Sequence, residues 1–161
     1  MTAKSKDKKS AGLLVFRRKK HGLEVFLAHM GGPFWQRKNA GAWTIPKGEF
    51  ESEAALDAAR REFQEETGFV PQGNFCTLQP VKQPGGKIVF AFALEWDCDA
   101  AQIKSNSFEM EWPKGSGKMR AFPEIDRAAW FEMEEAKKRI LRGQIPLLNE
   151  LQKVLKTPGQ V

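Results

Sequence analysis

The chain has 161 residues, of which 41% are hydrophobic and 29% are charged, the size and composition of one soluble globular domain. Its 26 Lys and Arg residues outnumber 20 Asp and Glu, and the net charge of +6 favours anionic partners such as nucleotides, polyphosphates or nucleic acid. No apolar run approaches the roughly 20 residues of a transmembrane helix, so no membrane partner is expected. The N-terminus "MTAKSKDKKS" lacks the apolar segment of a signal peptide, which indicates a cytoplasmic protein.

Residues 1–10 are rich in lysine, and we expect them to form a disordered basic tail that precedes a single domain over residues 11–161. Without the charges of this tail the net charge falls to about +3. Cys76 and Cys98 lie far apart and have no neighbouring Cys or His cluster. The sequence therefore predicts two buried free thiols, with no zinc site and no disulfide partner.

Two β-rich runs, residues 11–18 and 23–30, flank the short "KKHG" turn and predict a hairpin. A Gly-rich loop over 31–42 follows, and "WTIP" (43–46) predicts a short strand that ends at its proline. Strong helix formers fill residues 53–67. Ser52 is the expected N-cap of this helix, and Gly68 is its expected C-terminal glycine.

The second half of the chain is predicted to hold further strands and two helices. The strands are expected at 75–82, 87–96, 106–112 and 128–133, with a "QPGG" turn after the first and a "PKGSGK" loop after the third. The helices are expected at 134–141 and 145–155. Strands interrupted by one central helix and closed by helices indicate a mixed α/β domain.

The central helix places Glu62, Glu65 and Glu66 at positions i, i+3 and i+4, within one face beside an apolar face. Like charges at this spacing repel, and the C-terminal end of a helix disfavours anions. A compensating cation is therefore expected, and Mg²⁺ prefers oxygen ligands of this kind, with Mn²⁺ as a substitute. The alternative is a solvated acidic face that pairs with Arg60 and Arg61.

The segment "WTIPKGE" (43–49) precedes this helix, and seven residues separate Glu53 from "REFQEETGF" (61–69). The pattern resembles the signature of the Nudix hydrolases, except that four residues rather than five separate Gly48 from Glu53. The resemblance implies an α/β/α sandwich with a mixed β-sheet. It also implies a pyrophosphohydrolase, in which water attacks phosphorus in a nucleoside diphosphate linked to another group.

Through the same resemblance, Glu62, Glu65 and Glu66 are implied as ligands of Mg²⁺, with the backbone carbonyl of Gly48 joining them. Glu65 and Glu66 are at the same time candidate catalytic residues.

Arg61 and Glu53 complete the implied catalytic set. They would form an ion pair that orients the helix and the loop before it. Because two helical turns would separate them, this pair requires the chain at Glu53 to bend back.

A further carboxylate is suggested by "FPEIDRAAWFEM" (122–133), which resembles a segment of RNA pyrophosphohydrolases and, more loosely, of diadenosine tetraphosphate hydrolases. Glu124 in this segment is a candidate fourth ligand or general base, and its alternative is an ordinary surface glutamate. Glu109 and Glu111 are the reserve candidates.

The pattern "W-x-x-P-K-G" (43–48), which leads into the signature, resembles the corresponding segment of dinucleoside polyphosphate hydrolases. It favours a substrate such as diadenosine tetraphosphate. The chain has no tyrosine, so the candidates for stacking on a base are Phe34 and Trp35, whereas Trp43 is expected in the core. The candidates for phosphate contacts are Lys47, Arg37 and Lys38.

Other substrates stay open: ADP-ribose, oxidised nucleoside triphosphates and the 5′ end of RNA. A non-catalytic nucleotide-sensing module is the alternative of a different class. The complete "REFQEE" segment favours an enzyme over such a module. Pro84, at the distance from the signature typical of ADP-ribose hydrolases, is sufficiently explained by its turn.

Overall fold

The computed structural model describes residues 8–156. Its strands are β1 (Lys9–Lys19), β2 (Gly22–Met30), β3 (Trp43–Thr44), β4 (Lys47–Glu49), β5 (Cys76–Thr77), β6 (Val81–Lys82), β7 (Ile88–Glu95), β8 (Ser107–Glu111), β9 (Met119–Pro123) and β10 (Ile125–Glu132). Its helices are α1 (Ala55–Thr67), α2 (Met133–Arg139) and α3 (Ile145–Lys156), with 3₁₀ turns η1 (Ala100–Gln102) and η2 (Arg142–Gln144).

One mixed sheet forms the centre of the molecule, in the order β10-β2-β1-β7-β5. β1 pairs with β7 in parallel and with β2 antiparallel, while β3, β4 and β6 pair with β2, β1 and β7. Residues 10–16 of β1 are buried without interruption. This is the pattern of a strand that is covered on both faces of its sheet.

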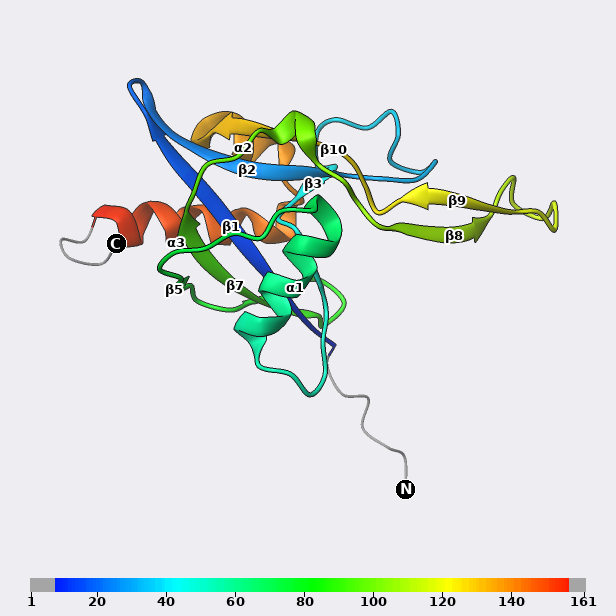
Figure 1. The fold of residues 1–161 in the computed structure, drawn as a ribbon, viewed down its shortest axis with the longest axis horizontal. Coiled ribbons are helices and arrows are strands. Elements are labelled where there is room, and N and C mark those ends of the chain that lie inside the picture. The colour runs from blue at the N-terminus through cyan, green and yellow to red at the C-terminus, as the bar shows by residue number, and fades with distance from the viewer. Residues whose placement is uncertain (1–7, 157–161) are drawn as a thin grey trace.

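Helix α1 covers one face of the sheet and α2 with α3 cover the other (Figure 1). On the α1 side, Ala59 and Phe63 pack with Leu13 and Val15 in one hydrophobic cluster. On the other side, the apolar stripe of α3 joins a second cluster through its three buried leucines, Leu147, Leu148 and Leu151. The predicted α/β/α sandwich with a mixed sheet is therefore confirmed. None of the helices within residues 8–156 is long and apolar enough to span a membrane.

The hairpin and the central helix lie where the sequence predicted them. Gly68 ends α1 with a left-handed φ of 81°, and its N–H donates to the carbonyl of Gln64 at 2.7 Å. The predicted cap at Ser52 is wrong, because Ala54 occupies the N-cap position and no side chain caps the helix. The chain before the helix instead carries Glu53 toward α1.

The predicted strand over 75–82 is wrong as one element and is instead the two short strands β5 and β6. Both pair with β7, but the register shifts by one residue between them. Pro80 lies at this break and has no N–H to donate to a ladder. The sequence also missed β4 and β9, and it placed the end of the basic tail too late, because β1 begins at Lys9. Residues 1–7 of that predicted tail lie outside the described range.

β8 and β9 form a two-stranded ribbon that projects from the rest of the molecule (Figure 1). At its root, the N–H of Glu124 donates to the carbonyl of Asn106, and the N–H of Gly31 donates to the carbonyl of Glu124, both at 2.9 Å. The ribbon is thereby joined to the loop that follows β2. Its root also lies beside the C-terminal half of α1, since the N–H of Asn106 donates to the carbonyl of Glu65 at 2.9 Å.

The loop between β2 and β3 is fixed by a buried histidine. His29 is fully buried, its Nε2 lies 2.6 Å from the carbonyl oxygen of Lys38, and its Nδ1 lies 2.7 Å from Oδ1 of Asp126. The carbonyl can only accept, so Nε2 carries a proton and donates it there. His29 therefore connects the loop over 31–42 to β10. Next to it, Trp43 is buried in the core as predicted, edge-on to the imidazole.

Candidate active site

An acidic cleft of about 500 Å³ lies between α1, β4 and the root of the ribbon. The residues that line it are Lys47, Gly48, Glu49, Glu62, Glu65, Glu66, Asn106 and Glu124. The fold thus brings together the three helix glutamates, the glycine of β4 and the glutamate that follows β9. These five were singled out from sequence as ligands or catalytic groups, and their roles remain predictions.

Glu66 is the deepest of these carboxylates, with only 8% of its surface exposed. Burial, together with the negative charge of Glu62, raises the pKa of Glu66 to about 9, although the charge and backbone N–H of Lys47 oppose this shift. Its Oε2 is buried and has no hydrogen-bond partner within the described chain. The alternative of a solvated acidic face does not hold for Glu66, because β4 and the ribbon root cover that side of α1.

Glu62 packs directly on the backbone of Gly48. A Cβ at Gly48 would lie 2.0 Å from Cδ of Glu62 and 2.2 Å from its Oε2. Only glycine therefore fits at this point of β4 while Glu62 keeps its position. The Glu62 side chain is 14% exposed, and burial raises its pKa even though Arg61 opposes the shift.

Arg61 gathers the carboxylates on the outer side of the cleft. Its Nε donates to Glu53 at 3.0 Å, and its Nη1 donates to Glu62 at 2.8 Å and to Glu65 at 3.2 Å. The chain at Glu53 bends back before α1, so the implied Arg61–Glu53 ion pair is present in the structure. The guanidinium lowers the pKa of Glu53, while these partners raise the pKa of Arg61.

The donor set of the cleft fits a divalent cation. Carboxylate oxygens are the ligands that Mg²⁺ prefers, the buried Oε2 of Glu66 lacks a partner among residues 8–156, and the missing side chain of Gly48 lets the Glu62 carboxyl lie directly against the backbone of β4. Within the described residues, no three acidic, His or Cys side chains already converge on one point. Arg61 explains this, because it holds Glu62 and Glu65 in its own hydrogen bonds.

Glu124 lies in the cleft, whereas the reserve candidates do not. Glu124 is exposed overall, but its partial burial in the cleft raises its pKa, and its charge contributes to the raised pKa of both Glu62 and Glu66. Glu109 and Glu111 lie on the ribbon and are not among the residues that line the cleft. The carboxyl of Glu111 instead accepts the N–H of Gly115 in the ribbon turn.

A second hollow of about 270 Å³ adjoins the acidic cleft and shares Lys47, Glu66 and Glu124 with it. Trp35 and Phe108 also line this hollow, so it offers aromatic surface next to the carboxylates. Burial, and to a lesser extent the charge of Lys87, lowers the pKa of Lys47. A lysine at the junction of the two hollows is well placed to contact an anion that occupies both.

The other predicted contact residues lie further out. Phe34 is 58% exposed, lines neither hollow and packs edge-on against Trp112 of the ribbon, with ring centroids 5.6 Å apart. Lys38 lies over the Trp35 ring, with its Nζ 5.1 Å from the centroid, and Arg37 is exposed on the same loop. Trp35 is therefore the only one of these four that the structure places in a lining position.

Two lining residues that sequence reasoning missed come from the ribbon and its root, namely Phe108 and Asn106. A signal was present, because Phe108, Met110 and Trp112 alternate with polar residues and so share one face of a strand. Only the position of the ribbon relative to α1 shows that this face lies beside the site.

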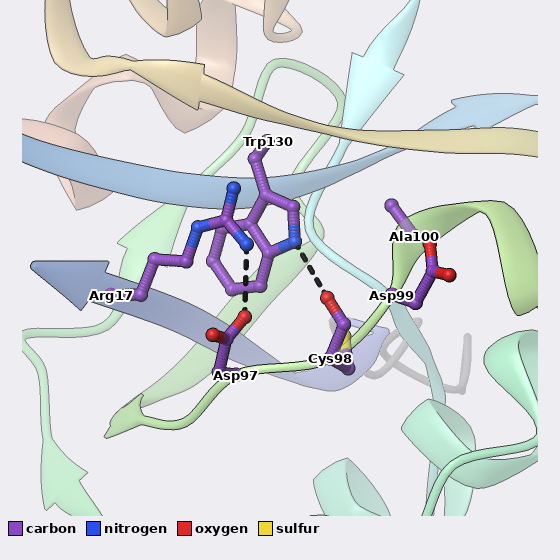
Figure 2. A pocket seen from close by; sticks show the side chains of 6 residues that line it. All are labelled: Arg17, Asp97, Cys98, Asp99, Ala100 and Trp130. Carbon is purple, nitrogen blue, oxygen red and sulfur yellow. Dashed lines mark hydrogen bonds and ion pairs between the residues drawn. The ribbon is translucent and has the colours of Figure 1, made fainter. Parts of the chain in front are cut away.

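A shallow hollow of about 620 Å³ on the opposite end of β1 holds a different cluster (Figure 2). Arg17 lies over the Trp130 ring at 4.2 Å and donates to Glu24 at 2.7 Å and to Asp97 at 2.9 Å. The indole N–H of Trp130 donates to the carbonyl of Cys98 at 3.0 Å. The guanidinium of Arg17 and the indole N–H of Trp130 are both engaged within this cluster, so we assign it to stability.

The two cysteines are free, as predicted, but half-buried rather than buried. Burial and the neighbouring charge of Asp97 raise the pKa of the Cys98 thiol to about 11. The thiol therefore stays protonated near neutral pH and is a poor nucleophile.

Replacing Arg17 with Met should destabilise the protein by about 2 kcal/mol, because it removes a cation–π contact and leaves the largely buried Glu24 with His21 as its remaining side-chain partner in the described chain. Arg17 lowers the pKa of Glu24 and Asp97 against the opposing effect of burial. Their ordinary values are 4.5 and 3.8, so this stabilisation is present at neutral pH and is lost as the pH falls through and below those values.

Urea unfolding between about pH 7 and pH 3 measures both effects, since Arg17→Met should also flatten the acid-dependent loss of stability. Arg18→Met is the matched control, because Arg18 pairs with Glu95 at 3.4 Å with both side chains about half exposed. It should cost less than about 0.5 kcal/mol. Equal effects of the two substitutions would contradict the role assigned to Arg17.

Comparison with known proteins agrees with the motif and the fold. The model of the NUDIX domain family matches residues 6–151. No curated protein sequence matches. Among solved structures, an Ap4A hydrolase from C. elegans in a binary complex is 22% identical, with a TM-score of 0.65, and the match covers 92% of this chain and 98% of that one.

Two further structures have the same fold. The NUDIX domain of Shewanella oneidensis NrtR, complexed with ADP ribose, is 16% identical with a TM-score of 0.67, and the match covers 94% of this chain and 90% of that one. A mutT/nudix family protein from Listeria innocua is 18% identical with a TM-score of 0.64, with 95% and 96% coverage. At these identities the three matches bear on the fold alone.

Proposed function

The chain belongs to the Nudix hydrolase family, and on that premise we propose that it hydrolyses a dinucleoside polyphosphate such as diadenosine tetraphosphate. In this reaction water attacks phosphorus, one P–O bond of an anhydride breaks, and the products are ATP and AMP. The observation that carries the proposal is the acidic cleft, which joins an aromatic hollow through Lys47, Glu66 and Glu124.

Glu62, Glu65 and Glu66 would hold Mg²⁺, together with the carbonyl oxygen of Gly48. When bound in such sites, a divalent cation activates water and neutralises phosphate charge. Arg61 orients the ligands, because it binds Glu53, which precedes α1, and two of the glutamates on it. Glu124 reaches the cleft from the ribbon root and is the proposed general base.

The substrate class follows from what surrounds the carboxylates. Lys47 contributes positive charge for the polyphosphate, and the surfaces of Trp35 and Phe108 in the adjoining hollow suit an adenine base. An Ap4A hydrolase and a NUDIX domain complexed with ADP ribose both have this fold, so the comparison does not separate the two substrates, and ADP-ribose is the main alternative. Oxidised nucleoside triphosphates and the 5′ end of RNA are further alternatives.

A hydrolysis panel with Mg²⁺, with and without EDTA, in which the nucleotide products are separated by chromatography, tests the proposal. It compares diadenosine tetraphosphate, ADP-ribose, 8-oxo-dGTP and 5′-triphosphorylated RNA. We expect metal-dependent cleavage that is fastest for diadenosine tetraphosphate and yields ATP and AMP. Preference for another substrate would overturn the assignment, and no cleavage of any would favour a nucleotide-sensing module.

A further inference from the structure

The two faces of the β8–β9 ribbon carry different kinds of side chain. The register pairs Phe108 with Phe122 and Met110 with Arg120, and the N–H of Trp112 continues the ladder to the carbonyl of Lys118 at 2.9 Å. Because cross-strand partners share a face, all six of these side chains lie on one face of the ribbon. That face, here called the aromatic face, carries two cations and no anion.

The opposite face of the ribbon has the reverse character. Glu109 and Glu111 alternate with the aromatic residues of β8 and therefore point the other way. Their partners across the ribbon are Ala121 and Met119, neither of which is charged. Among the cross-strand pairs of the ribbon, the two cations thus lie on the side that carries its aromatic rings.

The aromatic face is directed toward the loop over 31–42. A Cβ at Gly32 would lie 3.0 Å from the tip of the Phe108 ring, and Phe34 packs against Trp112. Phe34 is nevertheless 58% exposed, and Arg120 lies over the Phe122 ring at 5.6 Å. Rings with open surface and neighbouring cations are the components with which proteins bind nucleobases and their phosphates.

This face is continuous with the proposed active site. Phe108 lines the aromatic hollow, and Asn106 and Glu124 at the ribbon root line the acidic cleft. From Phe108 to Trp112 the face extends for four residues, about 13 Å. A ligand with one end in the cleft therefore reaches the aromatic face without leaving the surface.

We propose that the aromatic face of the ribbon, with Phe34, binds the second nucleoside of a dinucleoside polyphosphate while the first nucleoside and the scissile phosphates occupy the cleft. The inference rests on the proposed function. Trp112 and Phe34 stack on the second base, and Lys118 and Arg120 contact the distal phosphates. The projecting ribbon thereby selects substrates that carry a nucleoside at both ends.

The test compares diadenosine tetraphosphate with adenosine 5′-tetraphosphate, which has the same phosphates but lacks the second adenosine. For Trp112→Ala and Phe34→Ala, kcat/KM for diadenosine tetraphosphate should fall about tenfold or more, mainly through KM, because base stacking is lost. With adenosine 5′-tetraphosphate the same variants should match the wild type. Met119→Ala, on the opposite face, is the control and should change neither substrate.

Equal losses with both substrates, or no loss with either, would overturn the proposal. A loss of activity that is confined to 5′-triphosphorylated RNA would also overturn it and would assign the face to RNA. A change in the oligomeric state of the ribbon variants, measured by size-exclusion chromatography, would likewise overturn it and would assign the face to a second copy of the chain. Thermal unfolding of each variant excludes a folding defect. If the wild type cleaves neither tetraphosphate, the proposed function itself fails, which is a separate outcome.

Discussion

Glu66→Gln should reduce kcat by about 10³-fold, equivalent to about 4 kcal/mol of transition-state stabilisation, while the metal-free protein keeps its stability. The carboxylate is 8% exposed and its Oε2 has no partner in the described chain, so its ionised form is costly unless a cation is bound. The neutral amide has nearly the same shape and avoids that cost. Its loss should therefore affect catalysis and not folding.

Steady-state rates with Mg²⁺ measure the expected loss of kcat, and thermal unfolding with and without Mg²⁺ measures the expected effect on stability. Wild type should gain stability with Mg²⁺ by mass action, and Glu66→Gln should gain much less. Glu51→Gln is the control, since Glu51 is an exposed glutamate before the helix. Full Mg²⁺-dependent activity in Glu66→Gln, or an unchanged metal effect on its unfolding, would refute Glu66 as a ligand.

The fold was predictable wherever local pattern and tertiary packing agree. β1 and β2 are β-rich runs around a tight turn, and α1 combines helix formers with a C-terminal glycine. β4 was not predictable in this way, because Lys47–Glu49 has no strand pattern and is extended through its pairing with β1. β5 and β6 were predicted as one strand although Pro80 between them was a local signal of the break, whereas the register shift opposite β7 is set by the tertiary pairing alone.

The sequence predicted which residues gather at the candidate site, but it did not predict how deeply each of them is buried. Helical periodicity places Glu62, Glu65 and Glu66 near one another, and the family motif adds Gly48. Their exposure depends on which other segments cover α1, and the ribbon root lies some 40 residues further along the chain. Sequence periodicity reports that a face is polar, but it cannot report that another segment buries it.

The arrangement around Arg61 suggests how the protein tolerates this concentration of charge. Three carboxylates share one guanidinium, and Glu66, which Arg61 does not reach, has the strongly raised pKa. Burial of like charges destabilises a fold unless a counter-charge is present. The same groups that are unfavourable without a cation form a strong oxygen donor set when one binds, so stability and metal affinity oppose each other at this site.

Gly48→Ala should lower kcat/KM by about 100-fold, because the new Cβ would lie 2.0 Å from Cδ of Glu62 and displace its carboxylate from the cleft. The backbone of β4 cannot easily move away, since Gly48 pairs with Ala11 in β1 at the centre of the sheet. We expect a loss of stability of about 1–3 kcal/mol, typical of overpacking. Activity with Mg²⁺ and urea unfolding measure the two quantities.

A double-mutant cycle identifies the cause of that loss. Removal of the Glu62 side chain removes the atoms that the new Cβ would strike, so Gly48→Ala should cost little stability in a Glu62→Ala background. Activity should not return, because the carboxylate is then absent altogether. If Gly48→Ala costs the same in both backgrounds, the glycine is required for its backbone conformation rather than for close packing. The coupling of the two residues in stability, together with their shared loss of activity, would tie the shape of β4 to the position of the Glu62 carboxylate.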